Sequence, residues 1–353
     1  MDHLRSHTGL RGVAALMVAP VHMYCDEFVA GFDRTVLPFL NSVLAVDVFF
    51  VLSGFIIPYV YLDSRGLMNA TWRKFFLARF ARIYPLHILT IAIVGLMVLF
   101  ANAQGISMGR PYYASDLPPQ LLLIHAFPYI EKWAWIHPSW SISMEFLAYI
   151  AIFPFMTFAL KGNSKIWFET IIILCLCGLY VLTYWLCAAA DANAAMGWFA
   201  VGRVSAGFGI GFLLFKIYQK HPVITSRIQD HCDWILGIFL AGYIASCYKL
   251  FAFQWLILLV PPLVLSLTSN KPSFAAFVLG NRVMVWLGTI SYSVYMIHTI
   301  FGKIVVGLSD EFPTPSPFVG VILLIGLFTS LLMVSSLSYS LFENPARKWL
   351  SKR

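Results

Sequence analysis

Long apolar runs separated by short polar segments dominate the hydropathy pattern of this 353-residue chain. About 20 mainly apolar residues are enough for a helix to cross a bilayer. By that measure the pattern predicts ten transmembrane helices, near residues 8–28, 41–62, 83–103, 139–160, 166–190, 197–218, 233–248, 250–269, 283–304 and 317–342. The expected fold class is therefore all-α, a polytopic integral membrane bundle of about ten transmembrane helices.

The composition agrees with this class, because 60% of the residues are hydrophobic and only 11% are charged. No polar stretch is long enough to form a second domain. We therefore expect residues 1–353 to be a single transmembrane domain without an appended soluble domain. The six cysteines lack the spacing of metal or redox sites, so we expect no metal.

The net charge is +8, and the Lys and Arg residues are distributed unevenly between the loops on the two sides of the membrane. The segments on the amino-terminal side of the membrane hold 18 of the 24 Lys and Arg residues. Because positive charge gathers in cytoplasmic loops, this asymmetry predicts that both termini are cytoplasmic. It also accounts for the basic charge without a nucleic-acid partner.

Two polar side chains, Arg11 and His22, interrupt the first apolar segment. They are eleven residues apart, close to three helical turns, so they project from one face about 16 Å apart along the axis. Ionisable residues within a membrane helix commonly have a function. The alternative is that Arg11 reaches the headgroups while His22 hydrogen-bonds a neighbouring helix.

Two carboxylates also fall at membrane depth. Asp47 lies in the second span and needs a partner, for which an Arg or His on the first helix is the simplest choice. Either a structural ion pair or a catalytic role fits it. In the fourth span Ser141, Glu145 and Tyr149 recur every four residues and form one polar stripe, which favours function.

A basic segment precedes the third span and reads as an amphipathic interfacial helix over residues 71–85. Arg79 and Arg82 are three residues apart and share a face, with Arg73 and Lys74 one or two turns earlier. These side chains could bind lipid phosphates at the inner leaflet. They could also clamp the phosphates of a nucleotide-bearing cofactor, because paired guanidiniums bind phosphate as a fork.

The last two spans carry further polar residues. Ser291, Tyr295 and His298 share a face of the ninth span. The tenth closes on Phe-Glu-Asn-Pro at residues 342–345, which predicts the end of the helix before an inside basic tail.

Six short motifs, in this order along the chain, resemble the membrane acyltransferase family 3, whose members O-acylate surface polysaccharides and related acceptors. They are Arg-Gly-x-Ala-Ala-Leu with an Arg-x10-His spacing from Arg11, Asp-Val-Phe-Phe-Val-Leu-Ser-Gly-Phe from Asp47, Arg-x-x-Arg from Arg79 before Ile-Tyr-Pro, Trp-Ser-Ile-Ser-Met-Glu ending at Glu145, Ser-Tyr-Ser-Val-Tyr-Met-Ile-His ending at His298, and the closing Glu-Asn-Pro. No single motif is specific, but six in order are.

The resemblance implies a multi-pass protein of the bacterial inner membrane. It would take an acyl group, expected to be acetyl, from cytoplasmic acetyl-CoA and give it to a carbohydrate or glycolipid hydroxyl at the outer face. Arg11 and His22 would be the family's essential pair, and Arg79 and Arg82 its cytoplasmic arginine pair. Membrane lipids, and polysaccharide-assembly proteins where present, would be its partners.

Together these observations give one hypothesis for the site. Arg73, Lys74, Arg79 and Arg82 hold the coenzyme, and His22 acts as general base or as transient acyl carrier, two routes that the sequence leaves open. Arg11 positions the donor, and Asp26, Asp47 or Glu145 orients the His22 ring. The residues expected to line the substrate or support this machinery are Asp26, Ser141, Tyr149, Tyr295 and His298.

The rival function is a transporter or flippase whose path is lined by intramembrane charges. Such proteins usually carry paired repeats and broken helices. The sequence has no internal repeat that would favour that function.

Overall fold

The structure is a computed structural model that describes residues 4–23, 42–63, 65–106, 108, 112–130, 135–160, 165–309 and 316–351. Helices fill nearly all of these residues, and the one β-type pairing among them is an isolated antiparallel bridge between Leu62 and Met68. The predicted all-α membrane bundle is confirmed.

The long helices follow the predicted spans closely. They are α1 (Arg5–His22), α2 (Ser42–Tyr61), α3 (Trp72–Gln104), α7 (Ile166–Ala189), α8 (Gly197–Lys220), α10 (Cys232–Cys247), α13 (Arg282–Ser309) and α14 (Pro317–Ser338). Shorter α-helices complete the chain: α4 (Leu117–Leu121), α5 (Trp140–Leu147), α6 (Phe153–Ala159), α9 (Pro222–Asp230), α11 (Val260–Ser266), α12 (Phe274–Leu279) and α15 (Asn344–Ser351). Turns of other helical types are η4 (Ala114–Asp116), η5 (His137–Ser139), η6 (Ala148–Ile152), η7 (Phe253–Leu258) and η8 (Tyr339–Glu343).

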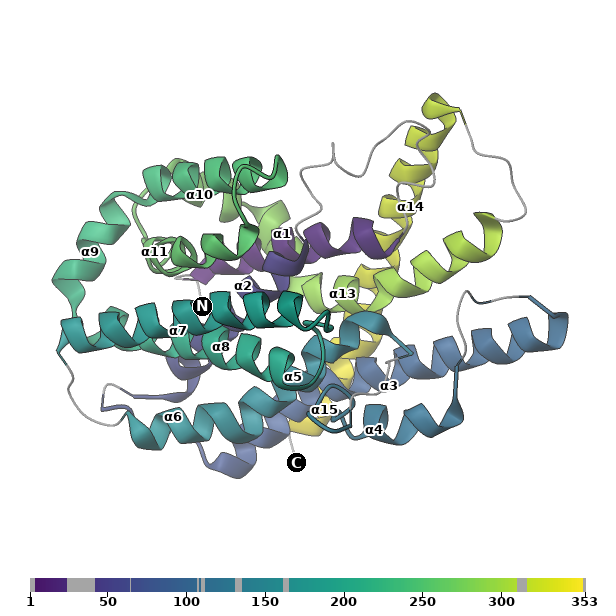
Figure 1. Cartoon of the computed structure of the whole chain (residues 1–353), viewed down its shortest axis with the longest axis horizontal. Helices are drawn as coiled ribbons and strands as arrows, with labels where there is room; N and C mark the ends of the chain where they lie inside the picture. The colour runs from purple at the N-terminus through teal and green to yellow at the C-terminus, as the bar shows by residue number, and fades with distance from the viewer. Residues whose placement is uncertain are drawn as a thin grey trace.

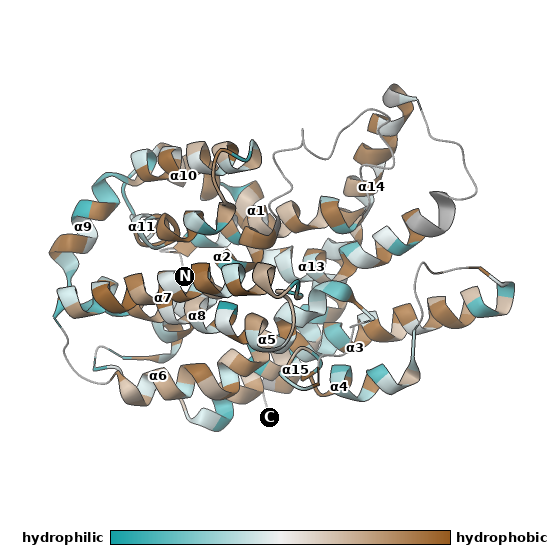
Figure 2. Cartoon of the chain, in the orientation of Figure 1, coloured by the Kyte–Doolittle hydropathy of each residue, from teal (hydrophilic) through white to brown (hydrophobic). Residues whose placement is uncertain are grey.

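Seven helical segments of the described chain are long and apolar enough to cross a membrane. Two shorter apolar segments, Cys232–Cys247 and Phe253–Ser266, coincide with the predicted seventh and eighth spans. Figure 2 shows apolar residues along all these helices, with hydrophilic ones more frequent near helix ends and where α13 and α5 approach each other. The total of ten spans stays a prediction.

Two boundaries differ from the prediction. The expected interfacial helix and the third span form one continuous helix, α3, and Thr71 caps its start by accepting a hydrogen bond from the Lys74 amide. At 33 residues α3 is about 50 Å long, well beyond the thickness of a hydrocarbon core. The last helix does not end at residues 342–345 but continues through η8 into α15.

The centre of the bundle is built on close helix contacts at glycines. In Figure 1, α1, α2, α7, α8 and α13 cross the view roughly side by side, whereas α14 leaves obliquely. A Cβ atom at Gly288 of α13 would lie 1.7 Å from the carbonyl oxygen of Thr8 in α1, and one at Gly54 of α2 would lie 2.1 Å from that of Phe208 in α8. Only glycine allows such approaches, so α1 packs on α13 and α2 packs on α8.

Candidate active site

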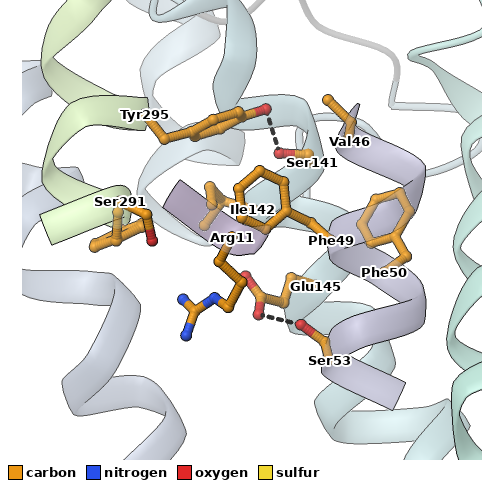
Figure 3. A pocket seen from close by; sticks show the side chains of 11 residues that line it. Arg11, Val46, Phe49, Phe50, Ser53, Ser141, Ile142, Glu145, Ser291 and Tyr295 are labelled. Atoms are coloured by element: carbon orange, nitrogen blue, oxygen red, sulfur yellow. Dashed lines mark hydrogen bonds between the residues drawn. The ribbon is translucent and has the colours of Figure 1, made fainter. Parts of the chain in front are cut away.

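A small cavity lies where α1, α2, α5 and α13 meet (Figure 3). Its volume is about 60 Å³, which holds a few water molecules but not a coenzyme. Its walls are Arg11 from α1; Val46, Phe49, Phe50 and Ser53 from α2; Ser141, Ile142 and Glu145 from α5; and Ser291, Tyr292 and Tyr295 from α13. Four sequence-predicted site residues therefore meet in one place: Arg11, Ser141, Glu145 and Tyr295.

Arg11 extends between α13 and α5, with Ser291 on one side and Glu145 on the other (Figure 3). None of the hydrogen bonds between the residues drawn there reaches its guanidinium. The nearby charged groups that act on it electrostatically are Arg82, Glu145 and Glu343. Arg11 is thus one cation of a larger cluster.

Glu145 anchors this cluster from the fourth apolar segment. Its Oε1 accepts hydrogen bonds from the Ser53 hydroxyl at 3.3 Å and from the Tyr149 hydroxyl. Tyr149 belongs to η6, a π-helical turn that widens the helix between α5 and α6. Single π turns inside α-helices are often found at functional sites.

Arg79 and Arg82 reach the same cluster from α3. Arg79 donates to the Tyr61 hydroxyl at 3.2 Å, and its guanidinium lies 5.2 Å from the centre of the Tyr61 ring. Arg82 forms an ion pair of 3.3 Å with Glu343. Arg73 and Lys74, near the start of α3, are exposed, so the four basic residues form an outer pair and an inner pair.

Glu343 is a further member of the cluster that was not predicted, because in the sequence it falls in an expected helix terminator. Pro345 has no N–H to give to the helix, and the helix passes it by means of the π-helical turn η8. Glu343 closes that turn, and its second oxygen accepts from the Ser293 hydroxyl at 2.8 Å. An acidic residue within an apolar segment was the available signal.

His22 lies in a different group at the other end of α1. Its ring centre is 5.3 Å from that of His137 in η5 and 5.5 Å from that of His298 in α13. A Cβ at Gly302 would lie 2.0 Å from the His22 carbonyl oxygen, so α13 also supports its backbone. His22 is half-buried against these neighbours.

The cavity and the histidine group are adjacent. Tyr295, in the cavity wall, hydrogen-bonds Ser141 at 2.7 Å, and its ring centre is 5.8 Å from that of His298. Its hydroxyl also donates to the carbonyl of Pro138, the residue after His137. Tyr295 therefore stands between the cavity and the three imidazoles.

Asp47 belongs to neither group, which corrects the expected pairing with the first helix. Its partner is Arg203 of α8, at 3.0 Å, and the Tyr180 and Tyr184 hydroxyls donate to its other oxygen. The close packing of α2 on α8 places this carboxylate against α8 rather than α1. Asp26, the other carboxylate proposed for orienting His22, lies outside the described residues.

Among the described residues, no group of three or more His, Cys, Asp or Glu side chains is arranged to hold a metal ion. The ionisable groups that the site brings together are guanidiniums, two carboxylates and a group of imidazoles.

Comparison with known proteins identifies the family. A family model described as "Acyltransferase domain" matches residues 6–336. The chain is 26% identical to the acyltransferase MdmB of Streptomyces mycarofaciens, with 99% of this chain and 93% of that protein aligned. It is 23% identical to the putative peptidoglycan O-acetyltransferase YrhL of Bacillus subtilis, with 96% of this chain and 54% of that protein aligned.

The peptidoglycan O-acetyltransferase OatA of Listeria monocytogenes is 22% identical, with 98% of this chain and 56% of that protein aligned. The chain thus spans about half the length of these two O-acetyltransferases. No solved structure matches it. Because the family model covers nearly the whole chain, this protein belongs to the membrane acyltransferase family 3.

Proposed function

We propose that this chain is an acyl-CoA-dependent O-acyltransferase that moves an acetyl group across the membrane to a hydroxyl of a surface carbohydrate. The observation that carries the proposal is the position of one small cavity between the arginine cluster and the histidine group. The cavity begins at Arg11 beside the α3 arginines and ends at Tyr295, next to the imidazoles around His22.

The arginine cluster suits an anionic donor. Arg11, Arg79 and Arg82 bring three positive charges, against two carboxylates from Glu145 and Glu343. An excess positive charge away from bulk water attracts phosphates strongly, and guanidiniums bind them in fork geometry. Arg73 and Lys74 are exposed and would meet the coenzyme first. On the predicted topology, all of this lies toward the cytoplasm.

The cavity suits the slender end of such a donor. The nucleotide stays at the arginines, because 60 Å³ is far below the size of pockets that enclose whole ligands. The pantetheine arm would extend from the arginines toward Tyr295 and widen this space as it enters. Arg11, beside the path, would hold the donor in position, and Glu145 with Tyr149 would hold the arginines apart.

His22 would carry out the chemistry. As general base it takes the proton of the acceptor hydroxyl while that oxygen attacks the thioester carbonyl, the C–S bond breaks, and the thiolate leaves with the proton from the imidazolium. Alternatively, the imidazole itself takes the acyl group and passes it to the hydroxyl. Ser141 and Tyr295 would shape the place where donor and acceptor meet, and His298 would support His22 from its side.

The acceptor class follows from the relatives, two of which are named as peptidoglycan O-acetyltransferases. The hydroxyl would approach from the outer face, where α1 ends at His22. We assign Asp47 a structural role with Arg203 rather than a catalytic one, and we assign the whole transfer to a single transmembrane domain. Family membership supports an enzyme over the transporter alternative.

The test is transfer of radiolabelled acetyl from acetyl-CoA to a carbohydrate acceptor by the chain reconstituted in vesicles. We expect His22→Ala to remove transfer while the protein remains folded. His231→Ala is the control, because His231 is an exposed imidazole with a local hydrogen bond to the Arg227 carbonyl. A fully active His22→Ala protein would refute the proposal.

A further inference from the structure

The imidazole beside His22 has a fixed tautomer. His298 is completely buried, and its Nδ1 lies 3.1 Å from the carbonyl oxygen of Val294, one turn earlier in α13. A carbonyl oxygen only accepts, so Nδ1 carries the proton and Nε2 carries a lone pair. Within the described chain, this buried Nε2 has no hydrogen-bond partner. An unsatisfied acceptor in a dry site costs free energy unless something uses it.

His22 needs an acceptor of that kind. When an imidazole takes a proton at one nitrogen, a group that accepts from its other N–H fixes the ring and stabilises the imidazolium. Of the three carboxylates offered by the sequence, the two in the described chain are engaged elsewhere, Asp47 by Arg203 and Glu145 by Ser53 and Tyr149. The third, Asp26, lies outside the described residues. The described imidazoles that lie next to His22 are those of His298 and His137.

The spacing of the two rings suits a direct contact. An N–H···N hydrogen bond of about 3 Å between two imidazole edges places the ring centres about 5 Å apart. The centres of His22 and His298 are 5.5 Å apart, and the planes are tilted by 34°. The contact of α1 with α13 holds the backbone at His22, so rotation of the half-buried His22 ring is the movement that would form the bond.

We propose that His298 is the positioning residue of His22: its Nε2 accepts the hydrogen bond from the His22 N–H that does not face the acceptor hydroxyl. The inference rests on the proposed function. It assigns the orientation of the His22 ring to an imidazole rather than to a carboxylate. In the described chain, His298 Nε2 is a buried acceptor without a hydrogen-bond partner that lies beside His22. His298 itself touches neither donor nor acceptor in this arrangement.

The test compares His298→Leu with His298→Gln in the vesicle assay. Leucine fills the space without an acceptor, and we expect it to lower kcat about 100-fold with KM for donor and acceptor unchanged. Glutamine offers an amide oxygen, and we expect it to recover kcat to within about tenfold of the original chain. If the leucine variant does not fold, the activity of the glutamine variant still tests the inference.

His87 provides a matched control. It is also fully buried, and its Nε2 lies on the Gln120 carbonyl, while its Nδ1 has no hydrogen-bond partner among the residues that the structure describes. It lies beside a second imidazole, His125, at 6.3 Å between ring centres. We expect folded His87→Leu and His87→Gln proteins to keep kcat. Equal losses of kcat in the two leucine variants would show a structural effect and overturn the inference, as would a folded His298→Gln protein no more active than His298→Leu.

The same assay separates this inference from the proposed function. If His22→Ala is inactive while His298→Leu is fully active, only the positioning role is wrong. If His22→Ala retains transfer, the general-base proposal fails and the positioning role fails with it.

Discussion

Two buried ionic groups in this protein differ in how completely they are satisfied. Arg203 donates to both oxygens of Asp47 and to the Ala194 carbonyl, and its guanidinium lies 4.5 Å from the centre of the Trp140 ring. Tyr180 and Tyr184 complete the carboxylate. This group contains no spare charge and no spare hydrogen-bonding group.

The arginine cluster is built differently. The Arg79 Nε is buried without a hydrogen-bond partner in the described chain, and Arg11 borders a cavity. The Asp47–Arg203 pair is fully buried and the clustered arginines are half-buried, yet both groups lie within the apolar bundle, so the presence of charge there does not by itself separate structure from function. The two groups differ in whether their charges and hydrogen bonds are fully paired. A group with paired charges holds helices together, whereas an excess of cations beside a cavity can bind an anion.

The largest expected effect comes from breaking the saturated pair. Asp47→Ala leaves the Arg203 guanidinium buried without a counter-charge, and we expect a loss of stability of about 3–5 kcal/mol. Thermal unfolding and the yield of monodisperse protein in detergent measure it. Replacing the whole pair, with Asp47→Leu and Arg203→Met together, should restore most of the stability. A double variant as unstable as the single one would contradict the structural role.

Arg11→Met should lower activity and leave stability nearly unchanged, the reverse of what we expect for Asp47→Ala. It removes one cation from a cluster with excess positive charge, so we expect the midpoint of thermal unfolding to stay within a few degrees. We expect kcat/KM for the donor to fall about 100-fold, a loss of about 2.7 kcal/mol in transition-state stabilisation. If Arg11→Met unfolds as Asp47→Ala does, the distinction between the two groups is wrong.

Glu343→Gln sharpens the comparison within the cluster. Glutamine keeps the shape of the side chain and can still accept from Arg82, while one negative charge is lost. The attraction of an anionic donor should rise by about 1 kcal/mol, which lowers its KM roughly fivefold. Steady-state kinetics with varied acetyl-CoA measure it, and a raised KM would show that Glu343 helps to bind the donor.

The smallest effect is expected at the exposed pair. Arg73→Gln combined with Lys74→Gln should raise the donor KM only about twofold, because exposed charges are screened by solvent and salt. The difference should vanish at high ionic strength. Arg227→Gln, an exposed cation on α9, serves as the control and should leave KM unchanged. A large increase in the donor KM that persists in high salt would show that the donor binds nearer to the start of α3 than we propose.

The sequence located most of the candidate residues but not their partners. Arg11, Glu145 and Tyr295 stand out because each interrupts an apolar run, and they do line one cavity. Asp47 stands out for the same reason, yet its partner Arg203 is 156 positions away on a helix whose neighbours no local pattern reveals. Glu343 escaped because a proline normally ends a helix, and only a π-helical turn carries this one further.

The chain alone determined the class of protein, the course of its apolar helices and the presence of charges inside them, because apolar run length and the cost of burying charge are local properties. The tertiary structure decided which charge meets which. Glycine contacts set α1 against α13 and α2 against α8, and those two pairings place His22 beside His298 and Asp47 beside Arg203. Such contacts join residues far apart in sequence, so they depend on how the helices pack rather than on any one segment.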